Sequence, residues 1–277
     1  MTIKKILFPT DISDVSKNAF IYALKLADAV NAEIITLHVY SLDSPAYLDA
    51  SIYLQEIYEY EELSEFENYK DEVPVLRNIA KANDLGHIRI SNVLIQGSLV
   101  SEVLKISKDE NIDFIVLGTK EVKHLTQIFL GTALTQIMDE SKVTVLGIPE
   151  NCEYTPISKI LFTTKYHLDD IDALQEVQNL AKVLNAHVDC LNIKPPHKIH
   201  NDDFAVDFKN VFNNSDIAFH SVLSDDVEGS ILDFIQQNSI NMMAVHIKHK
   251  GFFEKLFQVS LSKKLAVDIN IPFLSVK

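Results

Sequence analysis

The chain has 277 residues, 47% of them hydrophobic, and carries 39 Asp and Glu against 25 Lys and Arg, for a formal net charge of -14. This length suggests two domains of roughly 100–200 residues, and the hydrophobic content can supply two cores, which argues against a mainly disordered chain. The acidic balance argues against a general nucleic-acid or anionic-membrane surface, so small molecules or proteins are the expected partners.

Two features of the sequence bear on the compartment. Cys152 and Cys190 fit no metal or redox spacing, which favours a reducing environment. The apolar run near the N-terminus is too short for a signal peptide, and no run of about 18 apolar residues occurs. We therefore expect a cytoplasmic protein with no membrane partner.

The first half alternates short apolar runs with amphipathic segments. Buried strands are predicted over residues 6–8, 34–39, 93–95, 114–117 and 143–146, and helices over residues 75–82, 99–108 and 132–138. A further helix should follow Ser13, a candidate N-cap, carry apolar residues at three- and four-residue steps, and end at Asn31. Five strands alternating with helices predict a doubly wound α/β fold with a five-stranded parallel sheet.

Residues 41–70 are rich in tyrosine and glutamate and are predicted to carry a helix of their own. Leu54, Ile57, Leu63 and Phe66 would give this helix an apolar side. We interpret its carboxylates as a solvated face rather than a metal site.

The chain then repeats itself. KKILFPTDIS at residues 4–13 is echoed by SKILFTTKYH at 158–167, and NAEIITLHV at 31–39 by NAHVDCLNI at 185–193. Residues 240–276 follow residues 112–148 without a gap. This pattern predicts two tandem domains, residues 1–150 and 151–277, packed as an internal pseudo-dimer, with further homodimerisation left open.

Ligands of open parallel sheets bind beyond the carboxyl ends of the strands, where the strand order reverses. The candidate binding residues at these ends in the first half are Thr10, Asp11, Val39, Gly118, Thr119, Gly131, Thr132 and Ala133. An acidic side chain can accept hydrogen bonds from ribose hydroxyls, and the helix start at Gly131-Thr132 offers backbone N–H groups to an anion. These features predict a nucleotide, although the glycines could also serve tight turns alone.

The segments ILFPTDIS and LHV, with the glycine-containing stretch that ends in LGTAL, resemble the universal stress protein superfamily, and both halves share the resemblance. It implies tandem Rossmann-like domains of the adenine nucleotide alpha hydrolase-like kind, a stress-response sensor or regulator rather than an enzyme, and ATP or AMP, with magnesium, as ligand. By this resemblance Asp11 would contact the ribose, the Val39 backbone the adenine, and Gly118, Gly131 and Thr132 the phosphates.

One position departs from the family's phosphate loop, which runs glycine, two residues, glycine, nine residues, glycine and then serine or threonine. Glu121 stands where the second glycine belongs. Unit charges about 4 Å apart interact by roughly 1 kcal/mol in water and about 4 kcal/mol near a protein surface, which could lower affinity by one to three decades. Lys120, Lys123 and His124, or a magnesium ion, would offset this repulsion. We expect weakened binding; the alternative is an interaction module that binds no nucleotide.

The second half departs further from the nucleotide pattern. The replacements are Thr163 for Pro9, Lys165 for Asp11, His246 for Gly118 and Val259 for Gly131, while Ser260 keeps a hydroxyl. A β-branched valine does not allow the backbone approach that glycine allows. We predict a second domain that has lost the nucleotide motif and serves as a structural or partner-binding copy.

No pattern in either half predicts catalysis or metal binding. His197 with His200, and His246 with His249, have spacings a metal could use, but no Cys or carboxylate completes either set. Serines are many, yet none lies in a nucleophile-elbow motif. We therefore expect no catalytic residues and no metal site. A slow ATP hydrolase, for which no general base or metal set is identified, is the minor alternative.

Overall fold

The protein is described by a computed structural model that covers residues 3–41, 51–119, 132–197, 203–212, 216–247 and 271–277. Its contacts divide the chain into two compact units, residues 3–118 and residues 119–277. Gly131 and Glu121, as well as Val259 and Ser260 in the second half, lie outside the described residues. The predictions made for those four residues therefore remain predictions.

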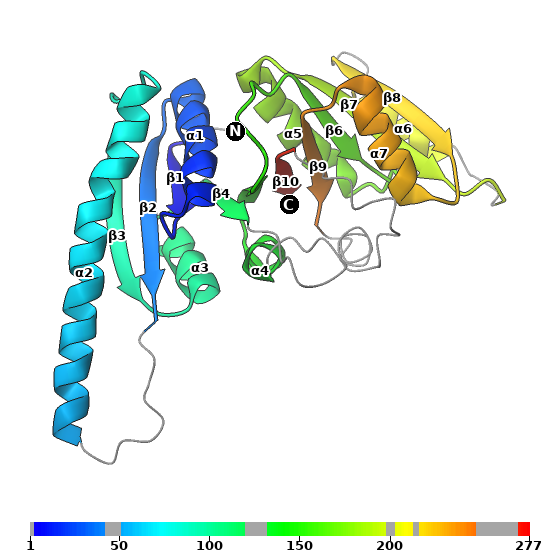
Figure 1. Ribbon diagram of the computed structural model, residues 1–277. Helices are drawn as coiled ribbons and strands as arrows, with labels where there is room; N and C mark the ends of the chain where they lie inside the picture. Colours follow the sequence, from blue (N-terminus) through cyan, green and yellow to red (C-terminus); the bar gives the residue numbers. More distant parts are fainter. Residues whose placement is uncertain (1–2, 42–50, 120–131, 198–202, 213–215, 248–270) are drawn as a thin grey trace. The chain divides into compact units, whose positions relative to one another are not determined.

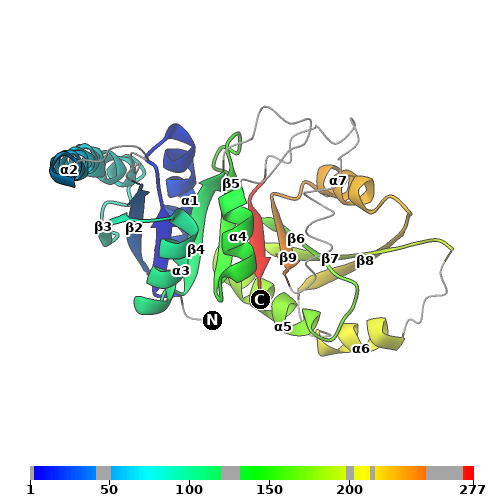
Figure 2. The ribbon, with the colours of Figure 1, turned by 90° about the horizontal axis from the view of Figure 1, so that it is seen from below.

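The unit of residues 3–118 is a parallel sheet with helices on both faces. Its elements are β1 (Lys5–Pro9), α1 (Asp14–Val30), β2 (Glu33–Tyr40), α2 (Ser51–Ala82), β3 (Ile90–Gln96), α3 (Leu99–Asp109) and β4 (Phe114–Thr119). The strands lie in the order β3-β2-β1-β4 and are all parallel. Figures 1 and 2 show α1 and α2 on one face and α3 on the other. The strand order therefore reverses between β1 and β4.

Local sequence signals set the ends of α1. The Ser13 side chain accepts a hydrogen bond from the backbone N–H of Ser16, and Asn31 ends the helix in the left-handed conformation with φ 55°. Asparagine tolerates this conformation better than most residues, which explains its use as a stop. Both predicted ends are confirmed, and the apolar stripe of α1 is buried against β1 and β2.

α2 differs from its prediction in two respects. A single helix replaces the two predicted segments and passes through Pro74. The predicted apolar side is wrong at Leu63 and Phe66, whose exposed fractions are 58% and 52%, whereas Tyr69 and Leu76 further along the helix are buried. Figure 1 shows the N-terminal part of α2 extending past the strands, so that part has no sheet to pack on.

The unit of residues 119–277 contains a second doubly wound sheet. Its elements are α4 (Thr132–Glu140), β5 (Thr144–Pro149), β6 (Lys159–Thr163), α5 (Asp170–Leu184), β7 (His187–Lys194), α6 (Asp203–Val211), β8 (Ile217–Leu223), α7 (Val227–Asn238), β9 (Met242–His246) and β10 (Phe273–Val276). The strands lie in the order β5-β10-β9-β6-β7-β8. The last five are mutually parallel, as predicted for the second repeat. α7 covers one face, and α5 and α6 cover the other (Figure 2).

β5 comes from the first sequence repeat and pairs in the antiparallel direction with β10 of the second. The pairing sets Leu146 opposite Leu274, which occupy equivalent places in the two repeats because residues 112–148 align with 240–276. A local two-fold axis therefore passes through this pair. Because β5 pairs with β10, it falls in the compact unit of residues 119–277, and the units divide near residue 118 rather than near the predicted repeat boundary.

In both repeats, a side-chain oxygen binds two successive backbone N–H groups where the first strand begins. In the first, the Asp113 carboxylate accepts hydrogen bonds from the backbone N–H groups of Lys4 and Lys5. In the second, the Asn241 side-chain oxygen accepts hydrogen bonds from Ser158 and Lys159 in the same way. Retention of such a specific contact supports duplication of one ancestral domain.

None of the described helices is both long and apolar enough to cross a membrane.

Candidate functional site

The turn after β1 is held by Thr10. Its backbone N–H donates to the carbonyl of Leu37, and its hydroxyl lies 2.9 Å from the Ser16 hydroxyl. The same hydroxyl oxygen accepts the N–H of Ile12, which has a left-handed φ of 56°. Thr10 is buried, so its role in this structure is to shape the turn.

Asp11 lies exposed on that turn, at the carboxyl end of the sheet. Its Oδ1 accepts hydrogen bonds from the backbone N–H and from the hydroxyl of Ser13, the N-cap of α1. These contacts orient the carboxylate at the strand end. A carboxylate oriented in this way can accept further hydrogen bonds from ligand hydroxyls.

Val39 and Gly118 lie near the carboxyl ends of β2 and β4, which flank β1 in the same sheet. Val39 pairs in register with Ile95 of β3. A Cβ atom at Gly118 would lie 3.1 Å from the carbonyl oxygen of Val15 and 3.3 Å from the Cβ of Ala19. The glycine therefore allows α1 to approach β4 closely, a packing role that does not require a ligand.

The remaining predicted residues belong to the end of β4 and the start of α4. Thr119 is buried at the last position of β4. Thr132 and Ala133 begin α4 as expected, whereas Gly131 lies outside the described residues. The structure therefore brings Thr10, Asp11, Val39 and Gly118 to the carboxyl ends of the strands of one sheet. The phosphate-binding half of the site stays a prediction.

A pocket of about 460 Å³ adjoins Asp11, and its other lining residues were not predicted. His38 lies beneath the turn, with Nδ1 2.9 Å from the Thr10 carbonyl oxygen, and stacks on Tyr69 with ring centroids 5.4 Å apart. Glu65, Asn68 and Asp71 of α2 complete the lining. Glu65 and Asn68 belong to the Tyr/Glu-rich segment of residues 41–70, and Asp71 follows it directly, so the alternation of tyrosine and acid in that segment was the available signal.

The negative charge of this pocket favours the ribose of a nucleotide over its phosphates. Asp11, Glu65 and Asp71 supply three carboxylates and no lysine or arginine lines the described wall. Phosphates would be repelled there, whereas ribose hydroxyls could donate hydrogen bonds to the carboxylates. The pocket thus suits an uncharged sugar.

The second repeat rebuilds the same turn with different side chains. Thr164 again shapes it, because its hydroxyl oxygen accepts the N–H of Tyr166, whose φ is 59°. Asn192 replaces His38 and donates to the Thr164 carbonyl oxygen at 2.7 Å. The predicted substitutions then alter the rest, with Lys165 following the turn and His246 ending β9.

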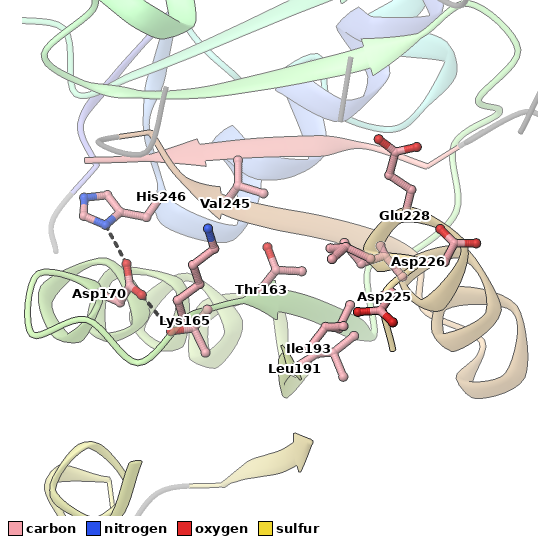
Figure 3. Close-up of a pocket in the computed structure, with 13 residues that line it drawn as sticks. Thr163, Lys165, Asp170, Leu191, Ile193, Asp225, Asp226, Glu228, Val245 and His246 are labelled. Carbon is pink, nitrogen blue, oxygen red and sulfur yellow. Dashed lines mark hydrogen bonds and ion pairs between the residues drawn. The ribbon is translucent and has the colours of Figure 1, made fainter. Parts of the chain in front are cut away.

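His246 fills the place of a glycine and is joined to a new carboxylate. Its Nδ1 lies 2.9 Å from Oδ1 of Asp170, and both side chains are 2% exposed. Asp170 stands where the first repeat has Ser16, and it also accepts the Thr164 hydroxyl at 2.7 Å. Figure 3 shows this pair at one side of a pocket of about 460 Å³. The close backbone contact that a glycine would allow is therefore not available at the end of β9.

Among the described residues, no group of three or more His, Cys, Asp or Glu is placed to hold a metal ion. This finding covers neither His200 nor His249, which lie outside the described ranges.

The strand-end sites and doubly wound sheets define a class of α/β protein with two tandem Rossmann-like domains. Comparison with known sequences then gives the family: the model of the universal stress protein family matches residues 2–149, more than half of the chain. The protein belongs to the universal stress protein family.

Relatives agree with this assignment. Universal stress protein MJ0577 of Methanocaldococcus jannaschii is 27% identical over 152 residues, covering 52% of this chain and 94% of the relative. Universal stress protein MJ0531 of the same organism is 26% identical over 145 residues, covering 52% of this chain and 81% of the relative. The crystal structure of a universal stress protein from Archaeoglobus fulgidus superposes with a TM-score of 0.68 at 18% identity, covering 99% of this chain and 96% of that one. That similarity extends the fold to both repeats.

Proposed function

We propose that this protein is a stress-response regulator whose first repeat binds an adenine nucleotide, ATP or AMP, with reduced affinity, and whose output is a binding signal rather than turnover. The observation that carries the proposal is the position of Asp11. Its carboxylate is oriented by Ser13 where the strand order reverses between β1 and β4, and it lines a pocket suited to ribose. Val39 and Gly118 lie at the same sheet edge.

The phosphate contacts of the proposal rest on Gly131, Thr132 and the positive end of α4. Glu121 would weaken these contacts by repulsion, and magnesium would be required for ATP more than for AMP. A cytoplasmic location is part of the proposal, and it agrees with two buried cysteines that form no disulfide.

Calorimetric titration of the full chain with ATP and AMP in magnesium tests the proposal. Asp11→Ala should weaken binding about tenfold or more, because a charged hydrogen-bond acceptor is lost. Asp14→Ala is the matched control, since Asp14 is a nearby exposed carboxylate at the first position of α1 that pairs with Lys17. Glu121→Gly should strengthen ATP binding. Binding that survives Asp11→Ala unchanged would show that the nucleotide lies elsewhere.

The second candidate is an interaction module that binds no nucleotide. The exposed Leu63 and Phe66 favour it, because they form an apolar pair one turn apart on α2 between carboxylates. Absence of nucleotide binding in both the wild type and Glu121→Gly would select this candidate.

A further inference from the structure

The second repeat contains a pocket that the nucleotide proposal does not use. It lies at the carboxyl ends of β6, β7 and β9, beside the start of α7, and has a volume of about 460 Å³. This volume lies in the range of small-molecule sites. Figure 3 shows Lys165 at one side of the pocket and a group of carboxylates at the other.

The floor of this pocket is apolar. Leu191 of β7, Ile231 of α7 and Val245 of β9 line it, and each is 1% exposed. Ile193, at the strand position that corresponds to Val39, extends the same surface. An apolar floor favours a ligand with a hydrocarbon or aromatic body.

The carboxylates belong to Asp225, Asp226 and Glu228. One of them, Asp226, has a structural role: it is the N-cap of α7, and its Oδ1 accepts a hydrogen bond from the N–H of Gly229 at 2.9 Å. Asp225 precedes the helix and makes no such cap. Burial raises the pKa of the Glu228 carboxyl, and the charge of Asp226 raises it further. A bound cation would relieve both unfavourable effects.

The wall of the pocket also contains a buried hydroxyl. Thr163 lines the pocket, and its Oγ1 is buried without a hydrogen-bond partner among the described residues. Figure 3 shows this hydroxyl directed toward the side where Val245 lies. Buried polar atoms are nearly always paired, so this hydroxyl is an unsatisfied polar group in the wall of a pocket whose floor is otherwise apolar.

The remaining charged groups limit the charge of the ligand. Asp170 is already paired with His246 and Thr164, so it adds little attraction for a cation. Lys165 places an ammonium group opposite the three carboxylates (Figure 3). A diamine would bring its second charge toward that lysine, whereas phosphates would meet the carboxylates.

We propose that the second repeat is a binding site for a monovalent organic ammonium ion with an apolar body. The ammonium group is held by Asp225 and Glu228, and the body lies on Leu191, Ile193 and Val245. The second repeat has thus exchanged one class of ligand for another. Binding here does not depend on the nucleotide proposed for the first repeat.

Calorimetric titration of the full chain with 2-phenylethylamine, and with 3-phenylpropionate as a probe of similar size and opposite charge, tests the proposal. The amine should bind saturably and the acid should not. Glu228→Gln and Asp225→Asn should each weaken amine binding about tenfold, because each removes a charged partner of the ammonium group. Asp226 is left unchanged because it caps α7.

Two matched controls test whether the loss of amine affinity is specific to the carboxylates of this pocket. Asp233→Asn removes an exposed carboxylate on the same helix outside the pocket, and Glu65→Gln removes one from the first-repeat pocket. Both should leave the amine affinity unchanged. The proposal is overturned if the amine does not bind, if the acid binds equally well, or if Glu228→Gln and Asp225→Asn have no greater effect than the controls.

Discussion

At the scale of single residues, the two repeats differ at a pair of positions whose side chains contact each other in the second repeat. The first has Ser16 and Gly118, and the second has Asp170 and His246, which contact each other at 2.9 Å in a buried setting. α5 begins at Asp170, two positions later in the repeat than α1, which begins at Asp14.

This pair should be energetically coupled. His246→Gly leaves the buried Asp170 carboxylate without its imidazole partner and should lower the free energy of unfolding by about 3–5 kcal/mol. The double variant Asp170→Ser with His246→Gly restores the residues of the first repeat and should cost less than the sum of the single changes by about 1 kcal/mol or more. Urea unfolding of the four proteins measures the coupling, and strictly additive losses would contradict it.

Because of Cys190, the free energy of unfolding should depend on pH in the alkaline range. Burial raises the pKa of its thiol well above the usual range, and the charge of Asp170 adds to the effect. Because the folded pKa is raised, the protonated thiol favours the folded state, and this contribution is complete below the unfolded pKa of about 8.5. Above it, the free energy of unfolding should fall by up to about 1.4 kcal/mol per pH unit.

The Cys190→Ala variant isolates this effect. Urea unfolding from about pH 7 to about pH 10 should show a steeper loss of stability in the wild type than in the variant. The comparison cancels contributions from Tyr69, whose pKa is also raised by burial. Parallel pH profiles would mean that the thiol ionises as freely in the folded protein as in the unfolded chain.

At the scale of elements, α2 contains its own weak point. Pro74 lies inside the helix, is exposed, and can donate no backbone hydrogen bond to the preceding turn. Pro74→Ala should therefore raise the free energy of unfolding by about 1–3 kcal/mol, since little packing is lost. Asn78→Ala, at an exposed position one turn on, is the control and should change stability by about 0.5 kcal/mol.

Thermal unfolding followed by circular dichroism checks this prediction. A Pro74→Ala protein no more stable than the Asn78→Ala control would show that the helix already accommodates the proline without loss, for example through a bend.

At the scale of the whole molecule, the pairing of β5 with β10 has consequences for assembly. The two strands are equivalent in the repeats and pair symmetrically about Leu146 and Leu274. A fragment of residues 1–150 keeps β5 but loses β10, which leaves an apolar strand edge exposed. We expect this fragment to form a two-fold dimer in which Leu146 faces its own copy.

Sedimentation equilibrium of the fragment measures this association. Leu146→Pro removes a ladder hydrogen bond and should return the fragment to a monomer. A fragment that is already monomeric at all concentrations would argue against the repeat symmetry as the basis of the β5–β10 pairing.

The sequence by itself determined the elements and their duplication, because caps, apolar periods and repeats act over short distances. Ser13 and Asn31 bound α1 where predicted, and the match between the halves was visible before any contact was known. The positions of Thr10, Asp11 and Gly118 at one sheet edge also followed, since parallel strands bring their carboxyl ends together.

Tertiary structure alone decided which surfaces those elements meet. Leu63 and Phe66 look like a buried stripe in the sequence, but exposure depends on whether a sheet lies beneath that part of α2. The acidic pocket at His38 and Tyr69, the Asp170–His246 pair and the pairing of β5 with β10 all join residues far apart in the chain. Such contacts arise from packing in three dimensions, which local sequence patterns do not encode.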